Sequence, residues 1–307
     1  MTSEMQIPKG KKGLRRILLT MLGGLAAAPA APAAEPAAEP VAGKPVAGSA
    51  AGPGPAPIQE TLVYKTVDGK SLSMLVAKPG TPPPASGWPC AIFFHGGGYR
   101  AGTPEKFRAL GVELAKHGVM SASVQYRLLG KGERIPKEGI ADGRSAMRYL
   151  RSRAATLHVD PNRIAAGGGS AGGHLAMMTW LKGPFDERSD DLSISARPQA
   201  LILMNTAYNL EARFKSQLAV PLSPYHQVGP DLPPTLMIHG TADTTVPFSD
   251  AVQFRDKAKS VGVKDLTLVP FEGRKHGFFH GEKGTGADFK AVTEQIVGFL
   301  RRIGWAE

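Results

Sequence analysis

Short apolar runs that alternate with helical patterns are the feature that most constrains the fold of this chain. Continuous apolar runs lie within residues 90–97, 200–205 and 235–240, and such runs are typical of strands buried on both faces. Helical periodicity marks segments 104–118 and 138–157. Buried strands that alternate with helices predict an α/β fold, with a mostly parallel central sheet and helices on both of its faces.

The other expected elements follow the same order along the chain. Segments 60–67 and 71–79 alternate apolar and polar residues around an Asp68-Gly69 turn, which predicts an antiparallel hairpin at the edge of the sheet. Further strands are expected at 119–128, 160–169 and 265–271, and further helices at 171–181, 249–261 and 287–303. In such a fold, ligands bind beyond the carboxyl ends of the parallel strands.

The first 57 residues have the composition of an export signal followed by a linker. Five basic residues within residues 1–16 precede the apolar run 17–28, a layout typical of a secretory signal peptide. We expect a signal peptide at 1–30, with an uncleaved anchor as the alternative, and an Ala/Pro-rich disordered linker at 31–57. Residues 58–307 are then one folded domain of a secreted or periplasmic protein, with association with the cell envelope as an option.

Charge and cysteine content exclude several kinds of site. Residues 1–57 hold six Lys/Arg and three Asp/Glu residues, so +8 of the net charge of +11 falls on residues 58–307. The basic residues are scattered and no nucleic-acid motif is present, so a solvated basic surface is favoured over a nucleic-acid partner. Cys90 is the sole cysteine, which excludes an intramolecular disulfide and a cysteine-based metal site.

Five glycines surround Ser170 at an expected strand-to-helix junction. The stretch "GGGSAGGHL" spans residues 167–175 and contains a G-x-S-x-G pattern. In this context the serine lies on a strained turn with its Oγ exposed, and the glycines let the strand and helix backbones approach closely. A phosphate-binding loop is the alternative, but it needs a lysine directly after the glycines, and the next lysine here is Lys182.

A nucleophilic serine needs a base and a residue that orients the base. Asp243 and His276 each come just after an expected strand, so both would reach the same sheet edge as Ser170. Asp250 and Asp265 are disfavoured, because the first starts an expected helix and the second precedes an expected strand. The other histidines that compete as the base are His280, the nearest rival, and His95, His174 and His239.

Three more glycines follow the strand expected within residues 90–97. They form the stretch His95-Gly96-Gly97-Gly98-Tyr99, whose backbone N–H groups are unobstructed by side chains and can donate to an oxyanion. The N–H of Ala171, at the start of the helix after Ser170, would point at the same oxygen. A flexible loop is the alternative, but the combination of the glycine stretch with the serine turn favours an oxyanion hole.

These motifs resemble those of the α/β-hydrolase superfamily, and within it the HGGG-containing esterases related to hormone-sensitive lipase and their small feruloyl and carbohydrate-acetyl esterase-like branch. The resemblance runs from about Thr61 to the C-terminus and rests on the motifs HGGGY, YRL, DPNRI, GGSAGGHLA, HGTADTTVPF and KHGF. It implies an α/β-hydrolase catalytic domain over residues 58–307. It also implies a serine carboxylesterase that works through an acyl-enzyme, with no metal or organic cofactor.

The resemblance assigns a role to each candidate residue. It implies Ser170 as nucleophile, His276 as general base and then acid, and Asp243 as the residue that holds the imidazole. The oxyanion hole would consist of the backbone N–H groups of Gly97, Gly98 and Ala171. His95 and Tyr126 would brace the glycine loop without reacting.

Two departures from the hormone-sensitive-lipase pattern bear on the substrate. Gly169 stands where that branch usually has an acidic residue, and only the Ala/Pro-rich stretch and a hairpin precede the glycine loop. Room for a lid remains only in segment 206–234, which contains Tyr208, Phe214, Tyr225 and His226. An open site with little cap suits polymer-borne or bulky esters better than long lipid chains.

The expected substrate is therefore a short-chain ester or a carbohydrate-linked acetyl or feruloyl ester, either a small molecule or a polysaccharide. A prolyl-oligopeptidase-like serine peptidase is one alternative, because it shares the fold and the HGTADTTVPF pattern, although the chain has no room for the propeller domain of that family. An envelope-tethered, non-catalytic hydrolase scaffold that binds polymers is the other. The complete set of candidate catalytic residues disfavours it.

Overall fold

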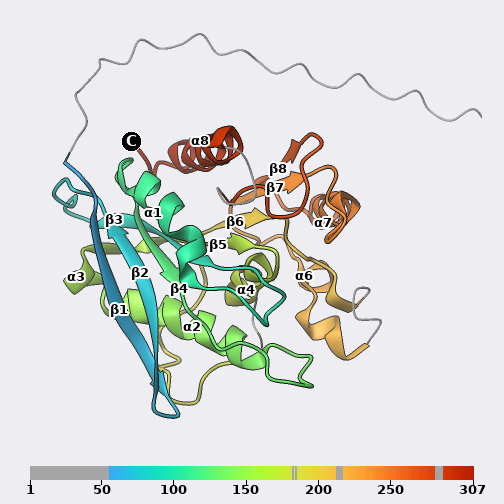
Figure 1. Ribbon diagram of the computed structural model, residues 1–307, viewed down its shortest axis with the longest axis horizontal. Helices are drawn as coiled ribbons and strands as arrows, with labels where there is room; N and C mark the ends of the chain where they lie inside the picture. Colours follow the sequence, from blue (N-terminus) through green and yellow to red (C-terminus); the bar gives the residue numbers. More distant parts are fainter. Residues whose placement is uncertain (1–54, 182, 184, 212–216, 281–285) are drawn as a thin grey trace, which may run out of the picture. The chain divides into compact units, whose positions relative to one another are not determined.

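An eight-stranded sheet lies at the centre of the computed structural model, which describes residues 55–181, 183, 185–211, 217–280 and 286–307 (Figure 1). The strands are β1 (Ile58–Val67), β2 (Lys70–Lys78), β3 (Trp88–Phe94), β4 (Met120–Val124), β5 (Val159–Gly169), β6 (Ala200–Met204), β7 (Thr235–Gly240) and β8 (Leu266–Phe271). Their spatial order is β1-β2-β4-β3-β5-β6-β7-β8. Strands β1, β2 and β4 pair antiparallel, whereas all later neighbours pair parallel. The predicted fold class, with its N-terminal hairpin, is confirmed.

Helices cover both faces of the sheet. Figure 1 shows α1 (Arg108–Ala115) and α8 (Gly286–Arg302) on one side and α2 (Lys137–Ser152) and α4 (Ala171–Trp180) on the other. Helix α7 (Phe248–Ser260) contributes Phe254 to the same apolar core as α2 and α4. The shorter helical turns are η1 (Pro104–Phe107), α3 (Ala154–Leu157), η2 (Gln217–Leu222) and α6 (Pro224–Gln227).

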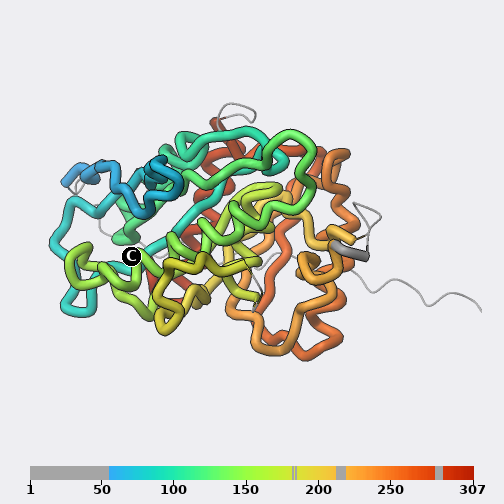
Figure 2. Tube along the Cα trace, turned by 90° about the horizontal axis from the view of Figure 1, so that it is seen from below, coloured from blue at the N-terminus to red at the C-terminus, as the bar shows by residue number. Residues whose placement is uncertain are grey.

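Strand β3 shows how the sequence builds the two cores. Cys90, Ile92 and Phe94 belong to the core under α2 and α4, whereas Ala91 and Phe93 belong to the core under α1 and α8. Because successive side chains of a strand point to opposite faces, a strand that is apolar throughout can feed both layers. All seven residues of β3 are buried accordingly. In the tube view the blue hairpin and the orange β7, α7 region lie at opposite ends of the sheet (Figure 2).

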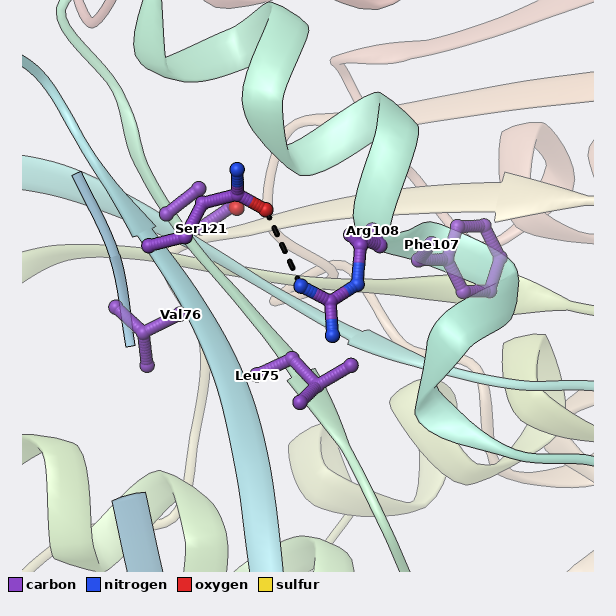
Figure 3. A pocket seen from close by; sticks show the side chains of 7 residues that line it. Leu75, Val76, Phe107, Arg108 and Ser121 are labelled. Carbon is purple, nitrogen blue, oxygen red and sulfur yellow. Dashed lines mark hydrogen bonds between the residues drawn. The ribbon is translucent and has the colours of Figure 1, made fainter. Parts of the chain in front are cut away.

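Helix α1 is hydrogen-bonded to the N-terminal hairpin beside a small pocket (Figure 3). There Arg108 Nη1 donates a hydrogen bond of 3.2 Å to Gln59 Oε1 of β1. Phe107, in the same stretch, is buried and stacks on Phe93 with ring centroids 5.1 Å apart. It also stacks on Phe279, at 6.4 Å. Phe107 therefore connects the α1 layer to the loop that follows β8.

Three elements differ most clearly from their expected bounds, whereas most others differ by only one or two residues. The strand expected at 119–128 ends at Val124, because Tyr126 turns inward and donates a hydrogen bond to the His95 carbonyl at 2.7 Å. The helix expected at 138–157 breaks at Arg153, which has non-helical dihedral angles, and continues as the short α3. The helix expected at 104–118 opens with the 3₁₀ turn η1 and ends at Ala115.

The first described residues, Pro55 and Ala56, are exposed but pass close to Gly80. A Cβ atom at Gly80 would overlap the backbone carbonyls of Pro55 and Ala56. The expected signal peptide and residues 31–54 of the expected linker lie outside the described residues. Within the part of the chain that the structure describes, no helix combines the length and the apolar character needed to cross a bilayer.

Candidate active site

The candidate residues follow the carboxyl ends of neighbouring parallel strands. Strands β3, β5, β6, β7 and β8 run in one direction, so their ends meet at one edge of the sheet. The residues that come directly or shortly after these ends are His95–Gly98, Ser170, Asn205, Asp243 and His276. The parallel register therefore assembles residues that lie far apart in the sequence.

Ser170 occupies a strained turn between β5 and α4. Its φ is 55° and its ψ is −121°, a combination that side-chain-bearing residues rarely adopt and that recurs at functional sites. Its N–H donates to the Met204 carbonyl at 2.9 Å, and its own carbonyl accepts from the His174 N–H at 3.2 Å. A Cβ at Gly168 or Gly172 would overlap the Phe94 carbonyl. The glycines therefore allow strand β3 to pass directly beside the serine turn.

Gly169 has a different reason to be glycine. A Cβ there would overlap the ring of Phe279, which comes from the loop after β8 and is itself buried. An acidic side chain before the serine, which is usual in the hormone-sensitive-lipase branch, has no space in this chain. The Phe279 ring thus occupies the volume that the acidic side chain of the hormone-sensitive-lipase branch would need.

Asp243 and His276 are joined by a hydrogen bond. The distance from His276 Nδ1 to Asp243 Oδ2 is 2.7 Å. Because an ionised carboxylate can only accept, Nδ1 carries the proton and Nε2 is left as the acceptor of the neutral ring. The Asp243 side chain is fully buried, whereas that of His276 is 23% exposed. This pair therefore presents a basic nitrogen that substrate and solvent can reach.

The Asp243 carboxylate is held by donors on both oxygens. Oδ1 accepts from the N–H groups of Thr245 at 2.8 Å and Val246 at 3.0 Å, and Oδ2 accepts from Asn205 Nδ2 at 2.6 Å as well as from His276. Burial acts to raise the pKa of Asp243, but the interactions with His239, His276 and the Val246 N–H outweigh it and hold that pKa well below its usual range. The group stays ionised at any ordinary pH.

The glycine loop lies against the serine turn. A Cβ at Gly96 would come within 3.3 Å of the Ser170 Cβ. Gly97 and Gly98 have positive φ values of 116° and 61°, and both are exposed. Nothing lies within 4 Å of the position that a Gly98 Cβ would take, so this backbone faces open space. Buried Ala171 begins helix α4 directly after the serine.

His95 and Tyr126 hold the base of this loop. Their rings stack with centroids 4.2 Å apart and an interplanar angle of 17°. The Tyr126 hydroxyl donates to the His95 carbonyl, and His95 Nδ1 lies 2.9 Å from the Gly96 carbonyl. Burial lowers the pKa of His95, so the ring remains neutral. A buried, neutral, stacked ring is suited to support the loop.

The competing histidines and acids lie elsewhere or are otherwise engaged. His174 is buried and hydrogen-bonds the Leu222 carbonyl at 2.7 Å, and its burial lowers its pKa to about 4. His280 packs on the Phe279 ring at 4.3 Å. Asp250 lies in the first turn of α7, and Asp265 pairs with Arg302 at 2.8 Å.

The segment expected to supply a lid is largely folded into the protein. Tyr208 is buried and stacks on Phe254 with centroids 4.4 Å apart. His226 is exposed and lies 3.3 Å from Glu211, and Tyr225 is half-buried beside it. Phe214 lies outside the described residues.

Asn205 and His239 both contact Asp243, which the sequence analysis did not predict, since it named His239 only as a competing base and did not name Asn205. Asn205 contacts Asp243 as described, and His239 Nε2 lies 3.4 Å from Asp243 Oδ2 and 2.9 Å from the Val246 carbonyl. The signal for Asn205 was present, because it comes directly after the buried strand β6. Among the residues that the structure describes, no three His, Cys, Asp or Glu side chains gather as metal ligands.

Two protein-family models match adjacent parts of the chain. The model described as BD-FAE matches residues 81–202, and the model of the prolyl oligopeptidase family matches residues 203–302. The first segment contains the glycine loop and Ser170, and the second contains Asp243 and His276. Each model thus covers one half of the candidate site.

Solved structures of a bacterial esterase match most of the chain. Esterase 2 of the planctomycete Thermogutta terrifontis is 36% identical, with a TM-score of 0.75, over 81% of this chain and 96% of that one. Structures of the same esterase have been solved with bound propionate and with bound butyrate. At this identity and coverage the likeness extends beyond the fold alone.

Curated relatives are also hydrolases by name. An AB hydrolase superfamily protein of Schizosaccharomyces pombe is 40% identical over 34% of this chain. The esterase LipC of Mycobacterium tuberculosis is 26% identical over 70% of it, and the ethyl acetate hydrolase of Pseudomonas putida is 35% identical over 38%. The chain spans 30%, 58% and 36% of the lengths of these three relatives.

Proposed function

The chain belongs to the serine esterases of the α/β-hydrolase superfamily, and from that premise we propose that it hydrolyses short-chain carboxylic esters through an acyl-enzyme. The observation that carries this proposal is the 2.7 Å hydrogen bond between His276 and the buried Asp243. It leaves His276 Nε2 as a base at the same sheet edge as the strained Ser170 turn. Nucleophile, base and orienting acid are the three parts that acyl transfer needs.

In the first half of the proposed reaction, Ser170 Oγ attacks the ester carbonyl carbon while His276 Nε2 takes its proton. The carbonyl oxygen becomes an oxyanion, which accepts hydrogen bonds from the N–H groups of Gly97, Gly98 and Ala171. The bond to the alcohol oxygen then breaks, and the imidazolium returns the proton to the leaving alcohol. The acyl group remains on Ser170.

In the second half, water takes the place of the alcohol. His276 accepts a proton from the water as it attacks the acyl carbon, and the acid leaves as Ser170 Oγ regains the proton. Asp243 stays ionised throughout, because its pKa is held well below its usual range by its hydrogen bonds despite burial. Its charge stabilises the imidazolium in both halves without taking the proton.

We propose acyl chains of two to about four carbons as the preferred substrates. The esterase of Thermogutta terrifontis, which has been crystallised with propionate and butyrate, supports this range. So does the name of the Pseudomonas putida relative, an ethyl acetate hydrolase. Acetyl or feruloyl groups on a carbohydrate are the polymer-borne form of the same chemistry, in line with the short segment available as a lid.

A series of p-nitrophenyl esters from acetate to palmitate, together with acetylated xylan and methyl ferulate, tests the proposal. We expect turnover that is highest for the short acyl chains and that falls by about 10⁴-fold or more in Ser170→Ala. Activity that peaks on palmitate would contradict the short-chain preference. An unchanged rate in Ser170→Ala would contradict the mechanism itself.

A peptidase is the second candidate, because the prolyl oligopeptidase family model matches residues 203–302. A blocked peptide anilide with proline before the scissile bond discriminates the two, since only a peptidase cleaves the amide efficiently. We expect a rate on this anilide that is far below the rate on the short esters. The reverse ranking would make the peptidase the better proposal.

We propose export as the setting of this activity, on the strength of the basic and apolar layout of residues 1–28. Fractionation of the native host followed by N-terminal sequencing tests it. Enzyme with an intact Met1 in the cytoplasmic fraction would contradict export. A new N-terminus near residue 30 outside the cytoplasm is the expected result.

A further inference from the structure

We infer that Asn205 is a positioning residue that orients the Asp243 carboxylate toward His276. This inference rests on the proposed function, since it concerns how the base of that reaction is held. The side chain of Asn205 donates to Asp243, so its action on the reaction passes through that carboxylate. The contacts, the backbone and the burial of Asn205 each support the inference.

The backbone of Asn205 takes a positive φ where it leaves strand β6. Its φ is 45°, and its N–H is fixed by a hydrogen bond of 2.9 Å to the Ile238 carbonyl of β7. Glycine adopts positive φ at the lowest cost, so the backbone alone would favour glycine here. Asparagine is, after glycine, among the residues that adopt positive φ most readily, so Asn205 fits this backbone and also carries a side-chain donor that glycine lacks.

The side chain of Asn205 is buried beside Asp243. Asn205 is fully buried, and its Nδ2 donates to Asp243 Oδ2 at 2.6 Å. A carboxylate can only accept, so the amide must turn its NH₂ group toward Asp243. The Oδ1 atom is thereby left without a hydrogen-bond partner among the described residues. The orientation of the amide is therefore set by its short bond to Asp243, made inside the protein.

The donors around Asp243 divide into two groups. The Thr245 and Val246 N–H groups belong to the same turn as Asp243 and fix Oδ1. Oδ2 receives Asn205 Nδ2 and His276 Nδ1, from the ends of β6 and β8. His239 Nε2 lies 3.4 Å from Oδ2, but the Val246 carbonyl is the closer acceptor for its hydrogen, 2.9 Å away. Asn205 thus fixes the direction from which His276 meets Oδ2.

The same bond sets how strongly Asp243 attracts the protonated His276. A donor to a carboxylate stabilises the charged form and weakens its basicity. Loss of the Asn205 donor therefore makes Asp243 a stronger acceptor, favours the imidazolium and raises the pKa of His276. His239 is the titratable neighbour that contacts Asp243. The loop that carries His276 also contains Glu272, Arg274, Lys275 and His280, and Asp288 pairs with Arg274. A change at Asn205 leaves all of these groups in place.

Asn205→Gly tests this inference because glycine suits the backbone and removes only the side chain. We expect kcat for p-nitrophenyl butyrate to fall about tenfold with KM changed less than about twofold. We also expect the acid limb of the kcat/KM profile, which requires neutral His276, to move to higher pH. Nuclear magnetic resonance of ¹³C-labelled histidine rings measures the pKa of His276 directly, with the signal assigned from a His276→Gln variant.

Two matched variants control for backbone and burial. Asp68→Gly also places glycine at a positive φ, of 50°, in the distant hairpin turn. Thr179→Val removes a fully buried hydroxyl that donates to the Ala176 carbonyl at 2.7 Å. Neither variant should move kcat or the pKa of His276, and thermal melting verifies that all three variants are folded.

The possible outcomes separate the inference from the proposed function. A lower kcat with an unchanged pKa of His276 would show a merely structural role and overturn the inference, as would unchanged values of both. If the wild-type protein hydrolyses no ester, the proposed function fails, yet the ring titration still decides whether Asn205 acts on His276 through Asp243. A raised pKa of His276 that occurs in Asn205→Gly and in neither control variant supports the inference.

Discussion

At the scale of single residues, Asp243 shows how a buried carboxylate is kept in its charged form. Two backbone N–H groups, an asparagine amide and a histidine ring all donate to its two oxygens. A buried charge without such partners would be neutralised by a shift of its pKa. Here the hydrogen bonds outweigh burial, and the pKa of Asp243 falls instead. The proposed base therefore keeps a fixed negative partner.

The substitution Asp243→Asn should disable this partnership. The new amide would present either its NH₂ group or a weaker acceptor to His276, and the ring would lose the preference for carrying its proton on Nδ1. We expect kcat for p-nitrophenyl butyrate to fall by about 10³-fold to 10⁴-fold with a small change in KM. A loss of less than tenfold would show that Asp243 does not hold the base.

The substitution Asp243→Asn should also change how the free energy of unfolding depends on pH. The folded-state pKa of Asp243 lies below its unfolded value of about 3.9. Its contribution to stability is therefore complete above that pH and is lost as the pH falls toward the folded-state pKa. Urea unfolding of wild type and Asp243→Asn should show a difference in the free energy of unfolding that shrinks between about pH 5 and about pH 2. A difference that grows toward acid would contradict this sign.

At the scale of elements, the loop after β8 is docked on the serine turn through one ring. Phe279 fills the volume that a side chain at Gly169 would occupy, and its other neighbours include Phe107 beside α1. Phe278, the preceding residue, is buried against Phe271 at 4.8 Å. Phe279 thus holds the loop that carries His276 against the end of β5, and Phe278 holds it against the end of β8.

Gly169→Ala should therefore destabilise the protein, because the added methyl group overlaps the Phe279 ring. We expect a loss of about 1–3 kcal/mol in the free energy of unfolding, and part of it should return when Phe279→Leu is added. Gly298→Ala is the matched control, because that glycine lies in α8 with nothing within 4 Å of its added Cβ. Helix propensity predicts that this control gains up to about 1 kcal/mol. Equal effects at both glycines would rule out the ring contact as the cause.

At the scale of the whole molecule, every candidate residue lies in the part of the chain that forms the sheet, its two helical layers and the loops between them. Ser170, Asp243, His276 and the glycine loop all lie between Ile58 of β1 and Arg302 of α8. The backbone carbonyls of Pro55 and Ala56 lie against Gly80. We propose that this part of the chain is sufficient for catalysis.

A variant that begins at Pro55 tests that proposal. We expect its kcat/KM for p-nitrophenyl butyrate to stay within about twofold of the full-length value, since no candidate residue is removed. Its melting temperature should also be close to that of the full chain. A folded but inactive variant would show that residues 1–54 take part in the reaction.

Much of this arrangement could be predicted from the sequence. Continuous apolar runs indicated the central strands, and the glycine patterns around Ser170 and Gly97 indicated where the backbone must approach closely. The residues that were missed carry weaker local signals. Asn205 resembles an ordinary turn residue after a strand, and its contact with Asp243 arises only from the parallel pairing of β6 with β7.

Element ends were also harder to predict, for physical reasons that are visible in the structure. Residues 125–128 continue the pattern of strand β4, but Tyr126 gains a stacking partner and a hydrogen bond by turning toward His95. Arg153 and the alanines after it favour a continuous helix by propensity. The turn at His158, with a φ of 56°, ends α3 there and leads into β5. Tertiary contacts therefore decide where β4 ends, and the left-handed turn at His158 decides where α3 ends.

The measurement that tests the central claim most directly is covalent labelling by paraoxon, followed by peptide mass mapping. The organophosphate phosphorylates the Thermogutta terrifontis esterase, and attack by an activated serine releases p-nitrophenolate and leaves a diethyl phosphoryl group on Oγ. We expect one adduct, on Ser170, that is absent from Ser170→Ala and forms at least about 10²-fold more slowly in His276→Ala. Labelling at another residue, or an equal rate in His276→Ala, would contradict the account.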